Sequence, residues 1–117
     1  MEIESYRENL KKIIDEEKRE LENRYNGFWE IAIKIASLLK EKYGAKRVWV
    51  FGSLTKKEMF NQWSDIDMAV EGIPHEIFYK AVGEATSISS DCKVDIVDMS
   101  DCSPALRENI LKEGILI

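Results

Sequence analysis

The chain has 117 residues, enough for one domain that buries about two thirds of its unfolded surface. A hydrophobic fraction of 44% with 33% charged residues excludes a disordered chain and indicates a compact domain. The net charge of −5 argues against strong nucleic-acid binding. No apolar stretch is long enough to span a membrane, and the N-terminus opens directly into a charged segment. We therefore expect a cytoplasmic protein without membrane association.

Residues 1–24 are predicted to form a charged helix. Fourteen of them are charged, eight acidic and six basic, and acid-before-base pairs such as Glu8 with Lys12 recur at helical spacing. Their apolar residues form only a thin stripe: Ile3, Tyr6, Leu10, Ile13, Ile14 and Leu21. So thin a stripe suits contact with a second subunit or a partner, with loose packing on the chain's own domain as the alternative. We therefore expect residues 1–24 to be an oligomer or partner contact and residues 25–117 to be the main domain.

The next segments predict a core helix and a first strand. At Asn26-Gly27 the sequence allows either a break or a helix that runs through the isolated glycine at a cost of about 1 kcal/mol. Apolar residues at helical spacing then indicate a buried helix that ends near Gly44. Residues 47–51 are rich in β-forming side chains, and Gly52-Ser53 ends this run. Residues 56–63 are polar with scattered apolar side chains, which predicts a short helix and a loop.

Two further strands are predicted at residues 66–70 and 93–99. A helix that begins near Pro74 connects them, and a last helix begins at Ser103-Pro104 and ends at Gly114. The inward-facing residues expected on this last helix are Leu106, Ile110 and Leu111.

This order of elements predicts an α/β (α+β) fold in which a small mixed sheet is flanked by helices. Gly52-Ser53 ends the first strand whereas Asp65 and Asp67 begin the second, so these groups meet only if the two strands are antiparallel neighbours. The helix between the second and third strands supplies the crossover that a parallel pair needs. Parallel pairing would place Asp95 beside the first two carboxylates.

The three carboxylates predict a metal site. Side chains alternate along a strand, so Asp65 and Asp67 share one face, where they repel each other unless a cation lies between them. A hard divalent cation takes oxygen ligands and keeps positions open for phosphate, which favours two Mg²⁺ ions, with Mn²⁺ as an alternative, that hold a nucleoside triphosphate for phosphoryl or nucleotidyl transfer. Asp95 is the third predicted ligand, whereas Asp98 points to the opposite face and is expected to be a surface residue.

Residues 48–53, 64–70 and 94–98 together resemble the minimal nucleotidyltransferases of the DNA polymerase β superfamily, and residues 106–114 look like the close of that domain. In this family an Asp-x-Asp pair and a later strand aspartate bind two Mg²⁺ ions, and a Gly-Ser pair binds the triphosphate. The resemblance implies those roles for the residues at the matching positions: Asp65, Asp67, Asp95, Gly52 and Ser53.

Two positions near the Gly-Ser pair depart from the family pattern. Leu54 and Lys57 stand where many members carry arginines, and the gap between Ser53 and Asp65 is one residue longer than usual. Lys57 is still expected to bind nucleotide by neutralising phosphate charge, with a solvated surface lysine as the alternative.

The resemblance also implies a partner. Small stand-alone members look like the antitoxin half of a toxin–antitoxin pair whose other half is an α-helical HEPN ribonuclease, and several transfer AMP from ATP to a tyrosine of that toxin. We therefore expect a protein adenylyltransferase that modifies a hydroxyl of a HEPN-type partner by AMPylation, in a homo- or hetero-oligomer. The alternatives are an antitoxin that only covers its partner's surface, and nucleotidyl transfer to a small molecule.

Overall fold

The computed structural model describes residues 2–117. Its helices are α1 (Glu2–Glu41), α2 (His75–Thr86) and α3 (Pro104–Glu113), and its strands are β1 (Arg47–Phe51), β2 (Ile66–Glu71), β3 (Val94–Asp98) and β4 (Ile115–Leu116). Two short 3₁₀ turns, Gly52–Thr55 and Lys57–Met59, connect β1 to β2. Within residues 2–117, no helix combines the length and the apolar character needed to cross a membrane.

The four strands form one mixed sheet in the order β3-β2-β1-β4. Strand β1 runs antiparallel to β2, with Phe51 opposite Asp67, and β2 runs parallel to β3, with Asp67 opposite Asp95. Both predicted pairings are therefore confirmed, as is the predicted fold class. Strand β4 was not predicted, because two residues are too few to show an alternating pattern; it pairs with Trp49 and Val50 at the edge of the sheet.

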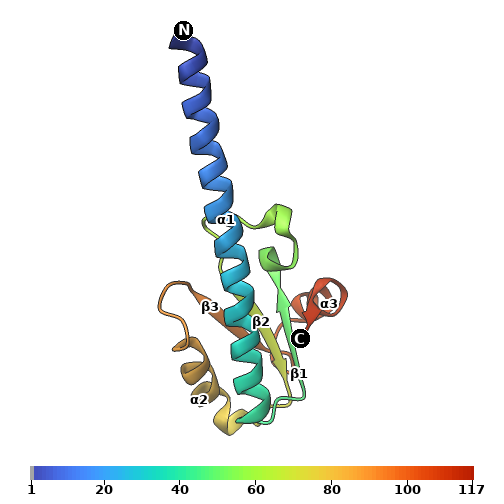
Figure 1. Ribbon diagram of the computed structural model, residues 1–117. Helices are drawn as coiled ribbons and strands as arrows, with labels where there is room; N and C mark the ends of the chain where they lie inside the picture. The colour runs from blue at the N-terminus through green and yellow to red at the C-terminus, as the bar shows by residue number, and fades with distance from the viewer. Residues whose placement is uncertain (1) are drawn as a thin grey trace.

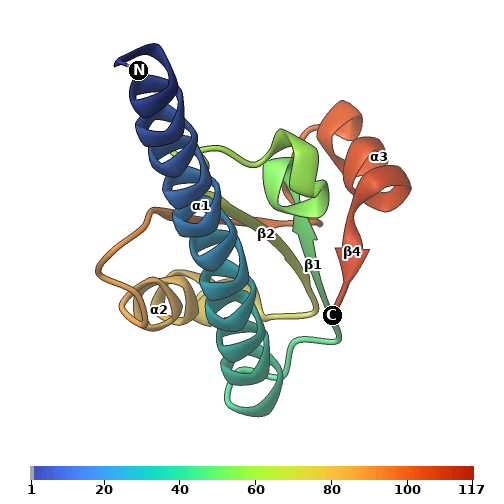
Figure 2. The same cartoon turned by 45° about the horizontal axis from the view of Figure 1, so that its top comes forward.

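Helices cover both faces of the sheet (Figures 1 and 2). Helices α1 and α2 pack on one face, where the main hydrophobic core includes Ile35, Leu39, Val48 and Met68. Helix α3 packs on the other face over a smaller cluster: Trp49, Ala69, Met99 and Ile110. Because neighbouring residues of a strand point to opposite faces, the carboxylates of Asp67 and Asp95 belong to the α3 side of the sheet.

Helix α1 is continuous through Asn26-Gly27, so the structure shows the second of the two alternatives there, a helix that runs through the glycine. A glycine inside a helix costs about 1 kcal/mol relative to alanine. That cost is outweighed by the burial of residues that follow on the same helix, among them Phe28, Ile35 and Leu39. Residues 1–24 are thus no separate helix, because residues 2–24 are the first part of α1.

The first half of α1 extends beyond the sheet (Figure 1), and the molecule is elongated, with principal extents of 67 × 28 × 17 Å. We call residues 2–20 the overhang, since all of their side chains are exposed. Its large apolar side chains, Ile3, Tyr6, Leu10, Ile13 and Ile14, are between 42% and 69% exposed. Partial burial begins at Leu21, which packs against the main core together with Tyr25. Of the predicted stripe, Leu21 therefore packs on the chain's own domain, whereas the five apolar residues before it are exposed.

The predicted limits of α3 are confirmed, but one of its predicted core residues is wrong. The Ser103 hydroxyl accepts a hydrogen bond from the Leu106 amide at 3.2 Å, and the Gly114 amide donates to the Ile110 carbonyl at 2.8 Å. Leu106 is partly buried and Ile110 is fully buried, whereas Leu111 is 57% exposed. A short helix on one sheet face buries a narrow stripe, so residues four apart reach the sheet and the next residue turns away.

Candidate active site

The turn after β1 is built around Gly52, whose φ of +75° lies in the left-handed region that favours glycine. A Cβ atom at this position would lie 2.6 Å from Oδ2 of Asp67, which is closer than atoms can approach. The hydroxyl of Thr55 donates to the Gly52 carbonyl at 2.7 Å and closes the turn. Glycine is therefore needed here both for the backbone conformation and for the space that the carboxylate of Asp67 fills.

Sheet register brings the predicted carboxylates to one end of the sheet. Asp67 lies directly opposite Asp95 on the parallel neighbour, and Asp65 immediately precedes β2. The pKa of Asp67 is raised, first by burial and then by the negative charges of Asp95 and Asp65, with Lys93 partly opposing the shift. The three carboxylates therefore interact electrostatically, as the sequence pattern predicted they would if they shared a site.

These carboxylates do not surround a cation site as they stand. Within residues 2–117, no group of three His, Cys, Asp or Glu side chains is close enough together to hold a metal ion. Asp95 instead has a cation beside it, with 3.6 Å between Nζ of Lys93 and its Oδ2 atom. Three carboxylates still form a donor set suited to Mg²⁺, and a cation would relieve the unfavourable charge that raises the pKa of Asp67.

Asp98 lies at the end of β3, and its carboxylate forms hydrogen bonds in the turn that follows. Its Oδ1 atom accepts hydrogen bonds from the Ser100 amide at 3.0 Å and from the Ser100 hydroxyl at 2.8 Å. It therefore stabilises the turn after β3, in agreement with its predicted separation from the other carboxylates.

The two positions that depart from the family pattern have structural roles. Leu54 is fully buried in the main core. Lys57 points to α1, where its ammonium group donates to Oε1 of Glu22 at 3.0 Å. Both partners of this ion pair are more than half exposed, so it contributes little to stability and Lys57 can exchange it for another anion. The role of Lys57 in nucleotide binding thus stays a prediction.

The loop before β2 contains positioning residues that we did not single out from the sequence. The Asn61 amide donates to the Ser64 hydroxyl at 2.9 Å, the Ser64 amide donates to the Asn61 carbonyl at 3.0 Å, and the Trp63 amide donates to Oδ1 of Asn61 at 2.8 Å. Ser64 is itself buried. These bonds fix the chain that leads into Asp65, and the signal in the sequence was the pair of turn-forming polar residues three apart.

Trp63 at the tip of this loop is 81% exposed, so it is not a core residue. Its indole is therefore free to contact a ligand or another protein.

Comparison with known proteins identifies the family. A family model described as polymerase beta, nucleotidyltransferase matches residues 33–117, which is well over half of the chain. No curated protein matches the chain.

Similar solved structures are toxin–antitoxin complexes. The chain is 26% identical to a chain in a mutant MntA–HpeT toxin–antitoxin structure, with a TM-score of 0.57, covering 72% of this chain and 68% of that one. It is 25% identical to a chain in a toxin–antitoxin structure with AMP-PNP, with a TM-score of 0.59 and coverages of 73% and 70%. A complex of tri-AMPylated HEPN toxin with MNT antitoxin from Shewanella oneidensis shares the fold at 22% identity, with a TM-score of 0.55 and coverages of 76% and 70%. The chain therefore belongs to the polymerase beta nucleotidyltransferase family.

Proposed function

We propose that this protein is a metal-dependent adenylyltransferase that passes AMP from ATP to a hydroxyl group of a HEPN-type partner protein. The observation that carries the proposal is the register of the sheet. It aligns Asp67 with Asp95 and sets Asp65 next to them, at the end of the sheet where the Gly52 turn leaves β1. This combination of carboxylates and an open glycine turn suits a triphosphate and its cations.

Each residue has a proposed role that follows from its position. Asp65, Asp67 and Asp95 would hold Mg²⁺, which when bound offsets the charge of the triphosphate and favours ionisation of an attacking hydroxyl. The turn at Gly52 and Ser53 leaves backbone open to phosphate oxygens. An oxygen of Asp95, exposed at the sheet edge, would accept the proton of the acceptor hydroxyl. The acceptor oxygen then bonds to the α-phosphorus while the bond to the β-phosphate oxygen breaks, and pyrophosphate leaves.

The solved structures support the nucleotide and the partner. One similar structure contains AMP-PNP, a nucleotide of the ATP type, and another contains an AMPylated HEPN toxin bound to its antitoxin. A chain of the same fold that keeps all three carboxylates is suited to the same class of reaction.

Binding without catalysis is the second candidate function. Two observations favour it: Leu54 is buried in the core, and Lys57 forms an ion pair with Glu22. Neither side chain therefore contributes positive charge to the turn at Gly52 in this structure. In this case the protein would neutralise its partner by covering its surface.

Label transfer separates the two functions. The protein is incubated with the HEPN-type partner, Mg²⁺ and ATP labelled in the α-phosphate, and label on the partner is measured. Transfer that Asp65→Asn eliminates and Asp98→Asn retains supports the enzyme, because Asp98 stabilises a turn outside the proposed site. Neutralisation of the partner without transfer, equal in the wild type and Asp65→Asn, supports the binding-only function.

A further inference from the structure

The overhang presents the same apolar face that the rest of α1 buries. Residues seven apart on a helix lie on nearly the same side, because seven residues make almost two turns. Ile3, Leu10, Ile14 and Leu21 are therefore in line with Phe28, which packs on Phe60 of the segment between β1 and β2, and with Ile35, which is fully buried in the core. Burial of this face ends near Leu21, and beyond it the face is exposed as far as Ile3, with Glu17 interrupting its apolar residues. We call the face formed by Ile3, Tyr6, Leu10, Ile13 and Ile14 the apolar seam.

The two flanks of the apolar seam carry opposite charges. Arg7, Lys11 and Lys18 are spaced by four and seven residues and line one flank, with Glu4 at its N-terminal end. Glu2, Glu16 and Glu20 are spaced by fourteen and four residues and line the other flank. All of these residues are exposed. The overhang thus resembles one helix of a coiled coil, in which charges beside an apolar seam select the partner helix and its orientation.

A second copy of this chain does not fit the apolar seam in either orientation. In a parallel pair, residues 21–41 of the copy would enter the space that the sheet occupies against Phe28, Ile35 and Leu39. In an antiparallel pair the sheets clear each other, but twofold symmetry places each flank opposite its own copy. Arg7, Lys11 and Lys18 would then face the same cations, and the acidic flanks would face each other, which is unfavourable.

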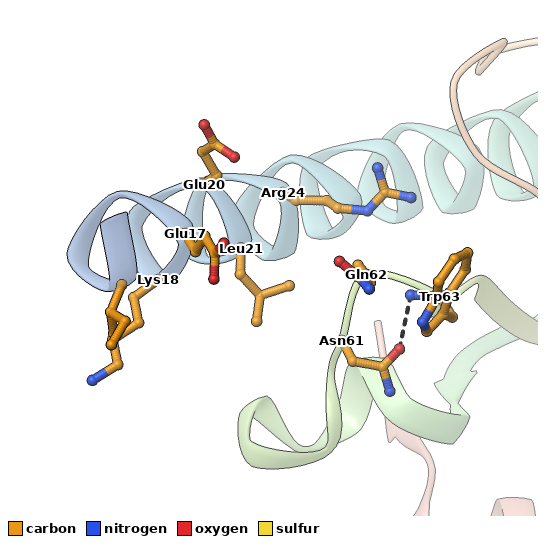
Figure 3. Close-up of a pocket in the computed structure, with 9 residues that line it drawn as sticks. Glu17, Lys18, Glu20, Leu21, Arg24, Asn61, Gln62 and Trp63 are labelled. Atoms are coloured by element: carbon orange, nitrogen blue, oxygen red, sulfur yellow. Dashed lines mark hydrogen bonds between the residues drawn. The ribbon is translucent and has the colours of Figure 1, made fainter. Parts of the chain in front are cut away.

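A groove continues the apolar seam toward the predicted active site. It lies between α1 and the loop before β2 and is lined by Ile14, Leu21, Arg24, Asn61, Gln62 and Trp63. Figure 3 shows Leu21 on α1 directed toward this loop, with Trp63 on the facing side. An exposed tryptophan beside an apolar surface is typical of the few residues that contribute most to binding. Because the loop leads directly into Asp65, a helix seated along the apolar seam would meet the molecule at the end of the sheet that holds the carboxylates.

We infer that the overhang binds an amphipathic helix of a different protein, with an acidic flank against Arg7, Lys11 and Lys18 and a basic flank against Glu2, Glu16 and Glu20. This inference rests on the proposed function in one respect, since the protein so held is the acceptor of the nucleotidyl group. The overhang then acts as a docking arm that brings the acceptor to the carboxylate end of the sheet.

Binding of a synthetic helical peptide of about 20 residues tests the charge pattern. The peptide carries a leucine seam with one acidic and one basic flank, and fluorescence anisotropy with the full chain measures its affinity. Lys11→Glu/Lys18→Glu should weaken binding roughly tenfold, because two attractive pairs become repulsive. Lys12→Glu/Arg19→Glu is the matched control, since it makes the same change in charge on the outer face of the helix. A second peptide with two basic flanks should reverse the order and prefer Lys11→Glu/Lys18→Glu to the wild type.

Two further measurements test which molecule binds the overhang. Sedimentation should find the full chain monomeric, whereas a dimer that Leu10→Gln/Ile14→Gln dissociates would overturn the inference in favour of self-association. The first peptide should also slow label transfer to the HEPN-type partner with wild-type protein more than with Lys11→Glu/Lys18→Glu. Equal peptide affinity for both double variants would overturn the docking arm even if transfer is intact. Loss of transfer alone, with the peptide affinities as expected, would instead count against the proposed catalytic function.

Discussion

The two halves of α1 share one apolar face, which is buried in the second half and exposed in the first. From Leu21 to Leu39 this face packs on the sheet and on Phe60 of the segment between β1 and β2, and Ile35 and Leu39 are fully buried. From Ile3 to Ile14 the same face lies in solvent, beside flanks rich in charge. The comparison teaches that helical periodicity identifies a face that must be covered but does not say what covers it. In the second half the cover is the chain's own sheet, and in the first half we propose that it is another protein.

The largest expected difference between the halves is in stability. Leu39→Ala removes side-chain atoms from the closed core and should lower the free energy of unfolding by about 2–5 kcal/mol. Leu10→Ala is the matched change on the overhang, where the leucine is 45% exposed, and should stay within about 0.5 kcal/mol of the wild type. Urea denaturation of both variants measures the difference. Similar losses in the two variants would mean that the overhang folds back on its domain in solution.

A substitution where the two halves of α1 meet should change the free energy of unfolding by a smaller amount and in the opposite direction. Gly27 lies inside continuous α1, and a methyl group added there meets no atom within 4 Å. Gly27→Ala should therefore stabilise the protein by about 0.5–1 kcal/mol, because alanine loses less backbone entropy in a helix. The same denaturation experiment measures the gain. A loss of stability would indicate that the helix is interrupted at Asn26-Gly27 after all.

The sequence predicted the sheet more fully than the helix that crosses it. Antiparallel β1 and β2 followed from the need to join Gly52 to Asp67, and parallel β3 followed from the connecting helix. The sequence did not decide between a break and a continuous helix at Gly27, because local propensity says nothing about the burial that outweighs it. Strand β4 was missed because its two residues are ordered by pairing with β1, which is a long-range contact.

The candidate site was predictable where the chemistry is local to a strand. Alternation along the second strand predicted that Asp65 and Asp67 share one face. In the structure Asp65 immediately precedes β2, and the register places Asp95 opposite Asp67. The pairing of Lys57 with Glu22 was not predictable, since it joins residues far apart in the sequence. The hydrogen bonds of Asn61 and Ser64 likewise depend on a loop conformation that composition alone does not specify.

The smallest expected effect on stability concerns Asp67, at the end of the sheet from which the overhang projects. The raised pKa of Asp67 means that the folded state binds more protons than the unfolded chain as this group titrates, so its ionisation costs stability as the pH rises. Asp67→Asn should therefore be more stable than the wild type at pH 7 without metal. The gain should shrink as the pH falls through the raised pKa of folded Asp67 toward the ordinary value of 3.8, and it should vanish below 3.8, where both states are protonated. Urea denaturation across pH 3–7 measures this trend, and a less stable variant at pH 7 would indicate a structural role for the carboxylate.

The central claim is that Asp65, Asp67 and Asp95 form one site for a metal and a nucleotide, and thermal melting with both ligands tests it most directly. A ligand that binds only the folded protein stabilises it by mass action, by about 2.7 kcal/mol at a hundred times its Kd. ATP with Mg²⁺ or Mn²⁺ should raise the Tm of the wild type and of Asp98→Asn. Each of Asp65→Asn, Asp67→Asn and Asp95→Asn should abolish the increase while the protein remains folded. An equal increase in any of these three variants would remove that residue from the site, and an equal increase in all three would contradict the claim.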